Sequence, residues 1–370
     1  MLISKQQKVV FFGCPLDCDE KHDAIEEKQA GAVLSGTTDD PFDTILDLVR
    51  QEVPAELWEA KGSIPVPSWL RPLPQGQDRL KLVVDEFIRF MDQDGCRQTA
   101  AEVDEFVTRQ VLPDLPCMVA VDHSLSGGVF KALVRHHGEE NLSLIIVDSH
   151  TDAVPMPLMA EAIQYDIDTN PNSVYDRNDP FLYNRTDSYN ASSFIHHLLA
   201  EHILAPANLY LIGVSDYPEK RALRLKDPRI AHYTGIWSGL KRRGVKVITK
   251  DECLTKPSKL KALLKNIKTP YLYISIDMDI GARNALEGVR FRNWKGLGEK
   301  QIYKVIGLIC DFVSKDIQLA GMDITEINPR RAGPSSASGQ DRTYRIATNL
   351  IKRVAFNLNP TSRKNLPQRH

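Results

Sequence analysis

The sequence predicts an α/β fold with a mostly parallel central sheet. Short apolar runs typical of buried strands alternate with segments in which apolar residues recur every three to four positions, as in core-facing helices. This alternation favours βαβ units, whose strands are parallel. In such a sheet we expect ligands to bind beyond the carboxyl ends of the strands.

The N-terminal part of the chain holds a strand, an irregular stretch and two helices. We expect the first strand at Val9–Phe12. Residues 35–79 are rich in Pro, Gly, Ser, Thr and Asp, and their later prolines are too closely spaced for a helix, so we expect an irregular insertion near 35–79. From Gln77 apolar residues return at helical spacing, which predicts a core-facing helix up to Phe90 and a second helix over 101–111.

Three later strands each deliver an acidic or imidazole side chain at the carboxyl end. We expect these strands at 117–121, 142–147 and 271–276. They run into Asp122-His123, Asp148-Ser149-His150-Thr151-Asp152 and Asp277-Met278-Asp279, respectively. A helical pattern follows each of them, at 128–137, 192–203 and 299–314.

The three strand ends together indicate a metal site. In extended backbone alternate side chains share one face, so residues 148, 150 and 152 can converge on one point. A lone Asp at a strand end often only caps a turn, but three such ends in one sheet favour metal binding. Two cations sharing a carboxylate fit this much anionic oxygen better than one, and the absence of a thiolate favours Mn(II) over zinc. The candidate ligands are His123, Asp148, His150, Asp152, Asp277 and Asp279.

Four separated blocks resemble the signature blocks of the ureohydrolases, the arginase and agmatinase superfamily. Their order and approximate spacing match the family, and the resemblance covers roughly residues 115–355. The blocks are His123-Ser124, Asp148–Asp152, Ser275–Asp279 and Gly321–Pro329.

The resemblance implies a fold, a cofactor and a reaction. The fold is a three-layer α/β/α arrangement, which we expect as one domain over residues 1–355. The cofactor is a pair of Mn2+ ions per chain, bound by the six candidate ligands. The reaction is hydrolysis of a linear C–N bond, in which Glu326 meets the substrate's guanidinium group and Asp152 takes a proton from the attacking water. The products would be urea and an amine.

Two departures from the family pattern limit this transfer. The family's proton-shuttling histidine aligns best with Asn190, which cannot shuttle a proton, so His196 or His197, one turn further on, are the candidates to replace it. A Gly-Thr-rich loop of the family is replaced by residues 287–294. We expect Asn190 and Ser192, with Glu326, to contact the substrate.

The connection over residues 156–189 is too long for a simple strand-to-helix link, and loops of more than about 12 to 15 residues often act as lids or binding loops. We therefore expect a second insertion near 156–189. Six residues of this insertion and of the loop 287–294 are candidates to shape the substrate pocket, although any single loop residue of this kind is more often simply exposed to solvent. They are Tyr165, Tyr175, Tyr183, Arg185, Arg290 and Arg292. Because the family's elements for free arginine are missing, we expect a small-molecule or peptidyl guanidino substrate of an atypical kind.

Composition excludes several other classes of protein. The 370 residues carry a formal net charge of -1, so the chain has no excess of positive charge that would indicate binding to nucleic acid or to an anionic membrane. The six cysteines are scattered, and Cys14 and Cys18 do not form a Cys-x-x-Cys motif, so we expect a reduced, cytoplasmic protein. No apolar run approaches the roughly 20 residues of a membrane span. We also expect a homo-oligomer, and a polar C-terminal tail over residues 356–370.

Three functions remain open from the sequence alone. The first is hydrolysis of a guanidino compound. The second is hydrolysis of an amide or amidine at the same site, as in deacetylases that resemble this fold. The third is a metal-binding regulatory or structural protein that has lost turnover. The complete ligand set argues for an enzyme, whereas Asn190 argues for the non-catalytic relic.

Overall fold

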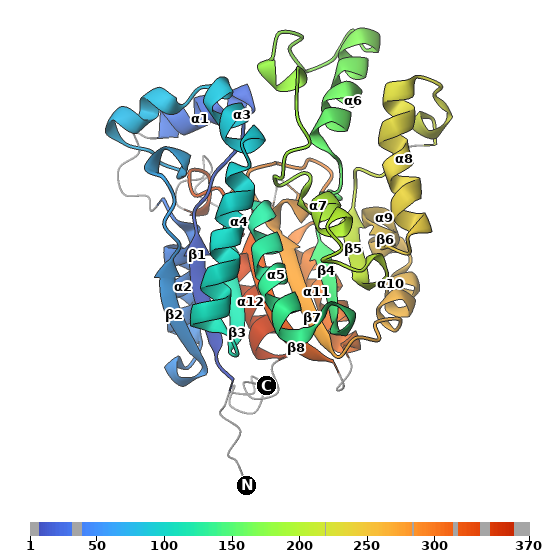
Figure 1. Ribbon diagram of the computed structural model, residues 1–370. Helices are drawn as coiled ribbons and strands as arrows, with labels where there is room; N and C mark the ends of the chain where they lie inside the picture. The colour runs from blue at the N-terminus through green and yellow to red at the C-terminus, as the bar shows by residue number, and fades with distance from the viewer. Residues whose placement is uncertain are drawn as a thin grey trace.

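The centre of the molecule is one parallel sheet. The computed structural model describes residues 7–31, 39–218, 220–282, 285–313, 317–333 and 341–358. Within them, eight strands form a sheet in the order β2-β1-β3-β8-β7-β4-β5-β6, and all neighbouring strands are parallel (Figure 1). The α/β fold around a parallel sheet is therefore confirmed.

The strands that carry the four sequence blocks are neighbours at the middle of this sheet, in the order β3-β8-β7-β4. Strand β8, the last along the chain, lies between β3 and β7, so residues far apart in sequence meet at its carboxyl end. The strand bounds are β1 Val9–Cys14, β2 Trp58–Ser63, β3 Leu115–Ala120, β4 Leu142–Val147, β5 Leu209–Val214, β6 Lys246–Thr249, β7 Tyr271–Asp277 and β8 Gln318–Thr325.

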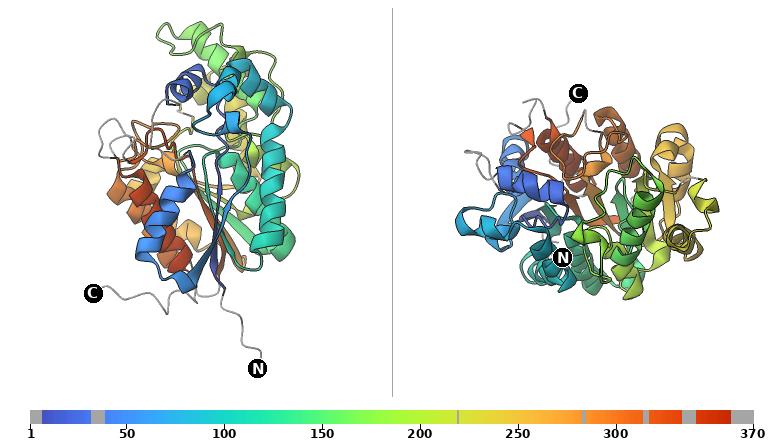
Figure 2. Two further views of the ribbon diagram at one scale, coloured as in Figure 1. Left: turned by 90° about the vertical axis from the view of Figure 1, so that its left-hand side faces the viewer. Right: turned by 90° about the horizontal axis from the view of Figure 1, so that it is seen from above.

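Helices cover both faces of the sheet and produce three layers (Figure 2). Side chains of α2, α9, α10, α11 and α12 pack on one face, and those of α3, α4, α5, α7 and α8 pack on the other. Helices α1 and α6 stand above the carboxyl ends of the strands in Figure 1. The helix bounds are α1 His22–Gly31, α2 Pro41–Glu52, α3 Val84–Asp92, α4 Gly95–Phe106, α5 Ser126–His137, α6 Met156–Thr169, α7 Phe194–Ala200, α8 Pro228–Arg242, α9 Lys250–Thr255, α10 Pro257–Leu264, α11 Glu299–Phe312 and α12 Thr343–Ile351.

The first strand shows why these apolar runs are continuous rather than alternating. Val9 and Phe11 are buried in the core on the α2 face, whereas Val10 and Phe12 are buried on the α4 face. Successive side chains of a strand point to opposite faces, and both faces of a parallel sheet are covered. All six positions of β1 are accordingly buried, and none carries a polar side chain that needs water.

The two predicted insertions contain more regular structure than expected. Residues 39–79 include helix α2 and the edge strand β2. Asp40 caps α2 by accepting a hydrogen bond from the backbone N–H of Phe42 (3.0 Å), and Pro41 occupies the first turn, where its missing N–H costs nothing. Helix α6 occupies the first part of the second insertion and packs against α8.

The first predicted helix begins later than expected. Residues Gly76–Lys81 form a 3-10 turn, α3 begins only at Val84, and Leu80 is 81% exposed. Helix α4 starts earlier than expected, at Gly95. At the other end of the chain, Phe356 is fully buried and stacks on Phe11, so it belongs to the core rather than to the predicted tail. Residues 359–370 of that tail lie outside the described residues.

Among the helices that the structure describes, none combines the length and the apolar character needed to cross a membrane.

Candidate metal centre

The carboxyl ends of the four central strands bring the predicted ligands together. His123 follows β3, Asp148 follows β4, Asp277 ends β7 and Glu326 follows β8. The six candidate ligands form two groups that share Asp148, and the possible ligand atoms within each group all lie within 4.8 Å of one another. One group is His123, Asp148, Asp152 and Asp277, and the other is Asp148, His150 and Asp279.

Several of these atoms point at one another without forming hydrogen bonds. His123 Nδ1 lies 2.7 Å from Asp152 Oδ2 and 3.2 Å from Asp277 Oδ2, yet it has no hydrogen-bond partner. Asp148 Oδ2 and Asp279 Oδ2 are buried and unpartnered as well. Buried polar atoms without partners are rare, and here they converge on the same points. Donors of this type and arrangement fit two divalent cations.

A hydrogen-bonded chain behind His123 leaves its Nδ1 lone pair available. Ser275 Oγ donates to Asp323 Oδ1 (2.7 Å), so it can accept a hydrogen bond from the Nε2–H of His123 (2.9 Å). Tyr273 donates its hydroxyl to the other oxygen of Asp323. Metal-binding histidines commonly donate their second nitrogen in this way.

The strand-end acids serve both the turn and the ligand cluster. Asp148 Oδ1 accepts the backbone N–H of His150 (2.7 Å), and Asp277 Oδ1 accepts that of Asp279 (2.7 Å). Such turns are the usual structural role of Asp in a loop. Because each turn uses only Oδ1, Oδ2 remains directed at the cluster.

Backbone strain marks two of the predicted catalytic residues. Asp152 and Glu326 have φ values of 49° and 63°, in the left-handed region that non-glycine residues avoid. A residue held there costs about 1–3 kcal/mol, and such residues concentrate at functional sites.

The buried acids cannot all be ionised without compensating positive charge. Burial and the neighbouring Asp148 raise the pKa of Asp152 to about 7. Burial, with Asp279 and Asp148 nearby, raises the pKa of Asp277 well above its usual range. For Asp148, the neighbouring His123 and His150 outweigh burial and lower the pKa. Two divalent cations would supply the missing charge.

Five of the six candidate ligands, all except Asp148, line a cavity of about 260 Å3 that also holds part of the predicted substrate site. Glu326, Ser192 and Tyr175 line it, together with Phe291 and Tyr233. Glu326 is buried, and burial raises its pKa to about 8 although the nearby Arg290 opposes that shift. These side chains surround the space in which a substrate would meet the ligand cluster.

Asn190 and His196 do not line this cavity. Asn190 Oδ1 accepts the backbone N–H of Ser192 (2.9 Å), so it forms the turn that positions Ser192, and it lines an adjoining cavity of about 110 Å3. His196 Nε2 instead lies 3.1 Å from Asp187 Oδ2. The structure therefore offers no contact between His196 and the ligand cluster among the described residues.

His197 completes a third group with Asp187 and His196, but its hydrogen bonding argues against a metal there. Arg97 Nη2 donates to His197 Nδ1 (3.0 Å), so the neutral ring carries its proton on Nε2, the atom that faces Asp187. The positive charge of Arg97 also opposes a cation.

Asp216 is a site residue that the sequence analysis missed. It follows β5 and accepts hydrogen bonds from the backbone N–H and the hydroxyl of Thr151 (both 3.2 Å), while its Oδ1 is buried without a partner. Burial raises its pKa to about 6. The sequence carries the same signal for Asp216 as for the predicted ligands, because an apolar strand is followed by an acidic residue, here in Ser215-Asp216.

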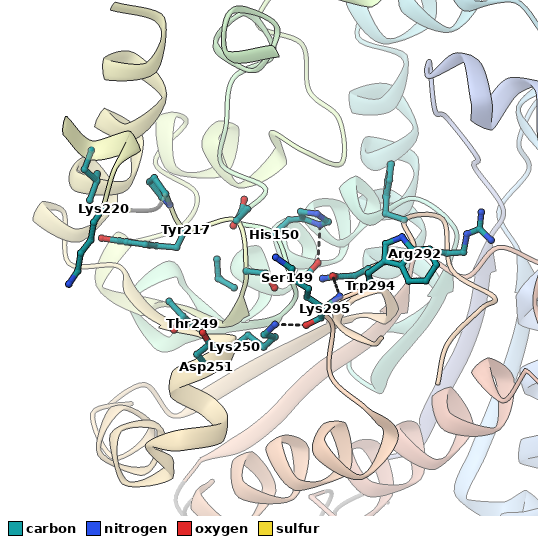
Figure 3. Close-up of a pocket in the computed structure, with 17 residues that line it drawn as sticks. Ser149, His150, Tyr217, Lys220, Thr249, Lys250, Asp251, Arg292, Trp294 and Lys295 are labelled. Carbon is teal, nitrogen blue, oxygen red and sulfur yellow. Dashed lines mark hydrogen bonds between the residues drawn. The ribbon is translucent and has the colours of Figure 1, made fainter. Parts of the chain in front are cut away.

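A second, larger cavity of about 900 Å3 adjoins the first, because His150, Asp216 and Phe291 line both. Its other residues come from the carboxyl ends of β5 and β6 and from the segments that follow β4, β5, β6 and β7 (Figure 3). Trp294 and Leu223 on its wall are exposed apolar side chains. Basic side chains also line it: Lys220, Lys250, Arg292 and Lys295.

Of the other predicted pocket residues, three lie away from the ligand cavity. Tyr165 packs under Arg229, Tyr183 donates its hydroxyl to the backbone of Arg177, and Arg185 pairs with Asp92.

The fold and the clustered His and Asp side chains together define an α/β protein with a candidate metal centre. The chain belongs to the arginase family, whose model matches residues 60–356. A search of curated proteins finds no match.

Solved structures with a similar fold include three that cover nearly the whole chain. Formimidoylglutamase from Bacillus subtilis has a TM-score of 0.56 and 16% identity, over 99% of this chain and 90% of that one. Arginase from Bacillus caldovelox has a TM-score of 0.55 and 17% identity, over 94% and 98%. Formiminoglutamase from Trypanosoma cruzi, solved with Mn2+, has a TM-score of 0.55 and 14% identity, over 98% and 96%. At these identities the likeness concerns the fold.

Proposed function

We propose that this protein hydrolyses a linear C–N bond at a centre of two Mn2+ ions, and that its substrate is a guanidino compound that yields urea and an amine. The observation that carries the proposal is the pair of ligand groups that share Asp148, with buried atoms that lack partners. Amidine or amide hydrolysis at the same site is the alternative reaction.

Four residues would hold one ion and three the other, with Asp148 in both sets: His123, Asp148, Asp152 and Asp277, then Asp148, His150 and Asp279. When bound, two such ions supply Lewis acidity and make water a usable nucleophile near neutral pH. Oxygen and imidazole donors without a thiolate support manganese rather than zinc.

The chain's own groups would orient the substrate and move the proton. Glu326 Oε2 is available to accept an N–H of the substrate, which would hold the trigonal carbon beside the ligand cluster. Asp152, on the cavity wall, would take the proton of the attacking water. Because Asn190 cannot donate that proton onward, the leaving amine would receive it from Asp152 or from solvent.

The substrate's tail would extend into the larger cavity. That cavity of about 900 Å3 opens beside His150 and Asp216. It has more room than the tail of a free amino acid substrate would occupy. Exposed apolar and basic side chains on its wall support a peptidyl or otherwise bulky guanidino substrate.

The proposed setting is the cytoplasm. All six cysteines are free, and five of them are buried, which agrees with a reducing compartment. The expected homo-oligomer stays a prediction.

A product screen tests the proposal. Manganese-loaded protein is incubated with guanidino, amidino and amide compounds, and urea and amine release are measured, with Asp148→Ala as the control. We expect release from at least one guanidino compound by the wild type and none by the variant. A loaded wild type that releases nothing, while Asn190→His gains turnover, would identify a relic of the family.

A further inference from the structure

A buried arginine joins the carboxyl ends of three strands beside the ligand cluster. Arg290 Nη2 donates to the backbone carbonyl of Cys18 (2.7 Å), and Nη1 donates to Asp122 Oδ2 (3.1 Å) and Glu326 Oε1 (3.0 Å). The backbone N–H of Arg290 also donates to the carbonyl of Glu326 (3.0 Å). Both the main chain and the side chain of Arg290 are therefore fixed against Glu326.

The surroundings of Arg290 balance its charge and hold it in place. Asp17 lies 3.4 Å from Arg290 Nε, and the same carboxylate accepts from Arg330 Nη1 (2.7 Å) and lies 3.5 Å from Lys28 Nζ. When ionised, three carboxylates face three cations in this cluster: Asp17, Asp122, Glu326, Lys28, Arg290 and Arg330. Arg290 is thus a permanent part of the site.

This pairing leaves one oxygen of Glu326 for a substrate. Oε1 already accepts from the backbone N–H of His123 (3.0 Å) and from Arg290. Oε2 is buried and has no hydrogen-bond partner, and Glu326 lines the ligand cavity. A substrate can therefore donate one N–H to Glu326 but cannot form a fork-to-fork pair with it.

Arg290 also cancels the charge that a cationic substrate would meet. A unit charge on the far side of one carboxylate changes the binding of an ion by roughly ten- to a hundredfold at the effective dielectric of a protein. A neutral head group feels no such effect. The ion pair of Arg290 and Glu326 consequently removes most of the gain in affinity that an unpaired Glu326 carboxylate would give a cationic head group over a neutral one.

We propose that Arg290 is a specificity-determining residue, which makes Glu326 recognise the substrate's head group by a single hydrogen bond instead of an ion pair, so that neutral ureido groups bind alongside cationic guanidino groups. The inference rests on the proposed function and deepens it, because it extends the substrate class of the same site.

Two probes with the same tail separate charge from shape. Butylguanidine is cationic and butylurea is neutral, and both offer N–H donors on a trigonal carbon. Their dissociation constants are measured by equilibrium dialysis against manganese-loaded protein at a pH above the Glu326 pKa of about 8, with the recovered probe checked to be intact. For the wild type we expect the two constants to differ by less than about tenfold.

Variants of the arginine test the cause. Arg290→Gln leaves the ionised Glu326 uncompensated, so the preference for butylguanidine should rise by about tenfold or more, whereas Arg290→Lys, which keeps the charge but not the guanidinium contacts, should change it less. Arg342→Gln removes the same charge from an exposed residue that pairs with Glu299 and should change nothing.

The wild-type ratio decides the matter even if Arg290→Gln does not fold. A wild-type preference for butylguanidine above about tenfold overturns the proposal. An unchanged ratio in a folded Arg290→Gln, or failure of both probes to bind, also overturns it. Failure of the proposed function would show differently, as absence of metal-dependent product release, because binding of the probes does not require turnover.

Discussion

His123 Nε2 lies 2.9 Å from Ser275 Oγ, and this contact determines which imidazole nitrogen faces the ligand cluster. Ser275 comes from β7 and His123 from the segment after β3, so the contact crosses strand β8, which lies between them. Asp323 on β8 accepts the hydroxyl of Ser275 and completes the chain. The central strands thus prepare the ligand before any ion binds.

The first prediction concerns this contact. Ser275→Ala removes the acceptor for the Nε2–H of His123, and we expect metal affinity to fall by about 10- to 100-fold, the usual effect of losing such a partner. Affinity is measured by competition with a chelator. Ser275→Thr, which keeps the hydroxyl, is the control. Equal affinities for all three proteins would show that Ser275 only fills space.

The second prediction follows from the shared ligand. Asp148 belongs to both groups, whereas Asp279 belongs to one. Elemental analysis after manganese loading should find about two ions per chain in the wild type, about one in Asp279→Ala or His150→Ala, and fewer than one in Asp148→Ala. Equal losses in Asp148→Ala and Asp279→Ala would contradict two groups with a common carboxylate.

The third prediction concerns Glu326. Glu326→Gln keeps the shape of the side chain but removes the charge that the carboxylate carries above its pKa of about 8. Metal content should be preserved while kcat/KM on the best substrate, measured above that pH, falls by about 10- to 100-fold, as expected for a lost charge-assisted hydrogen bond. Steady-state kinetics and metal analysis on the same preparation check this. Unchanged kinetics would remove Glu326 from substrate recognition.

The fourth prediction concerns pH and a histidine outside the site. Burial lowers the pKa of His137 from 6.5 to about 4, and its ring stacks on Tyr271 (3.9 Å between centroids). Between these pH values the unfolded chain binds more protons than the folded one, so the stability that neutral His137 contributes is complete above pH 6.5 and is lost as pH falls toward 4.

We therefore expect the free energy of unfolding to fall more steeply over this range in the wild type than in His137→Phe, which keeps the stacking but does not titrate. The difference should be about 1 kcal/mol, because the half-exposed ring is partly screened by solvent. Urea unfolding of metal-free protein at several pH values measures it. Parallel pH profiles would assign the loss to other groups.

The central strands and the ligand cluster could be predicted because local sequence carries both signals. In β4 the apolar run Leu142–Val147 is followed by three candidate ligands within five residues, Asp148, His150 and Asp152. The helix α2 was missed for a different reason. Composition over 35–79 outweighed the local pattern of Phe42, Ile45, Leu46 and Val49, which is a clear helical face.

The pairing around Glu326 could not be predicted because it depends on tertiary contacts. Arg290 stands 36 positions before Glu326, and only the placement of β8 between β3 and β7 brings its loop to that carboxylate. The place of His196 likewise depends on Asp187, which holds it away from the cavity. Spacing along a helix does not reveal such a partner.

The fifth prediction is that two metal ions at the ligand cluster support hydrolysis. Metal-free protein is titrated with Mn2+, and amine release from the best guanidino substrate is followed as a function of ions added per chain. We expect release that rises to a plateau at about two equivalents and is absent in Asp148→Ala. A plateau at one equivalent, or release that is independent of metal, would contradict it.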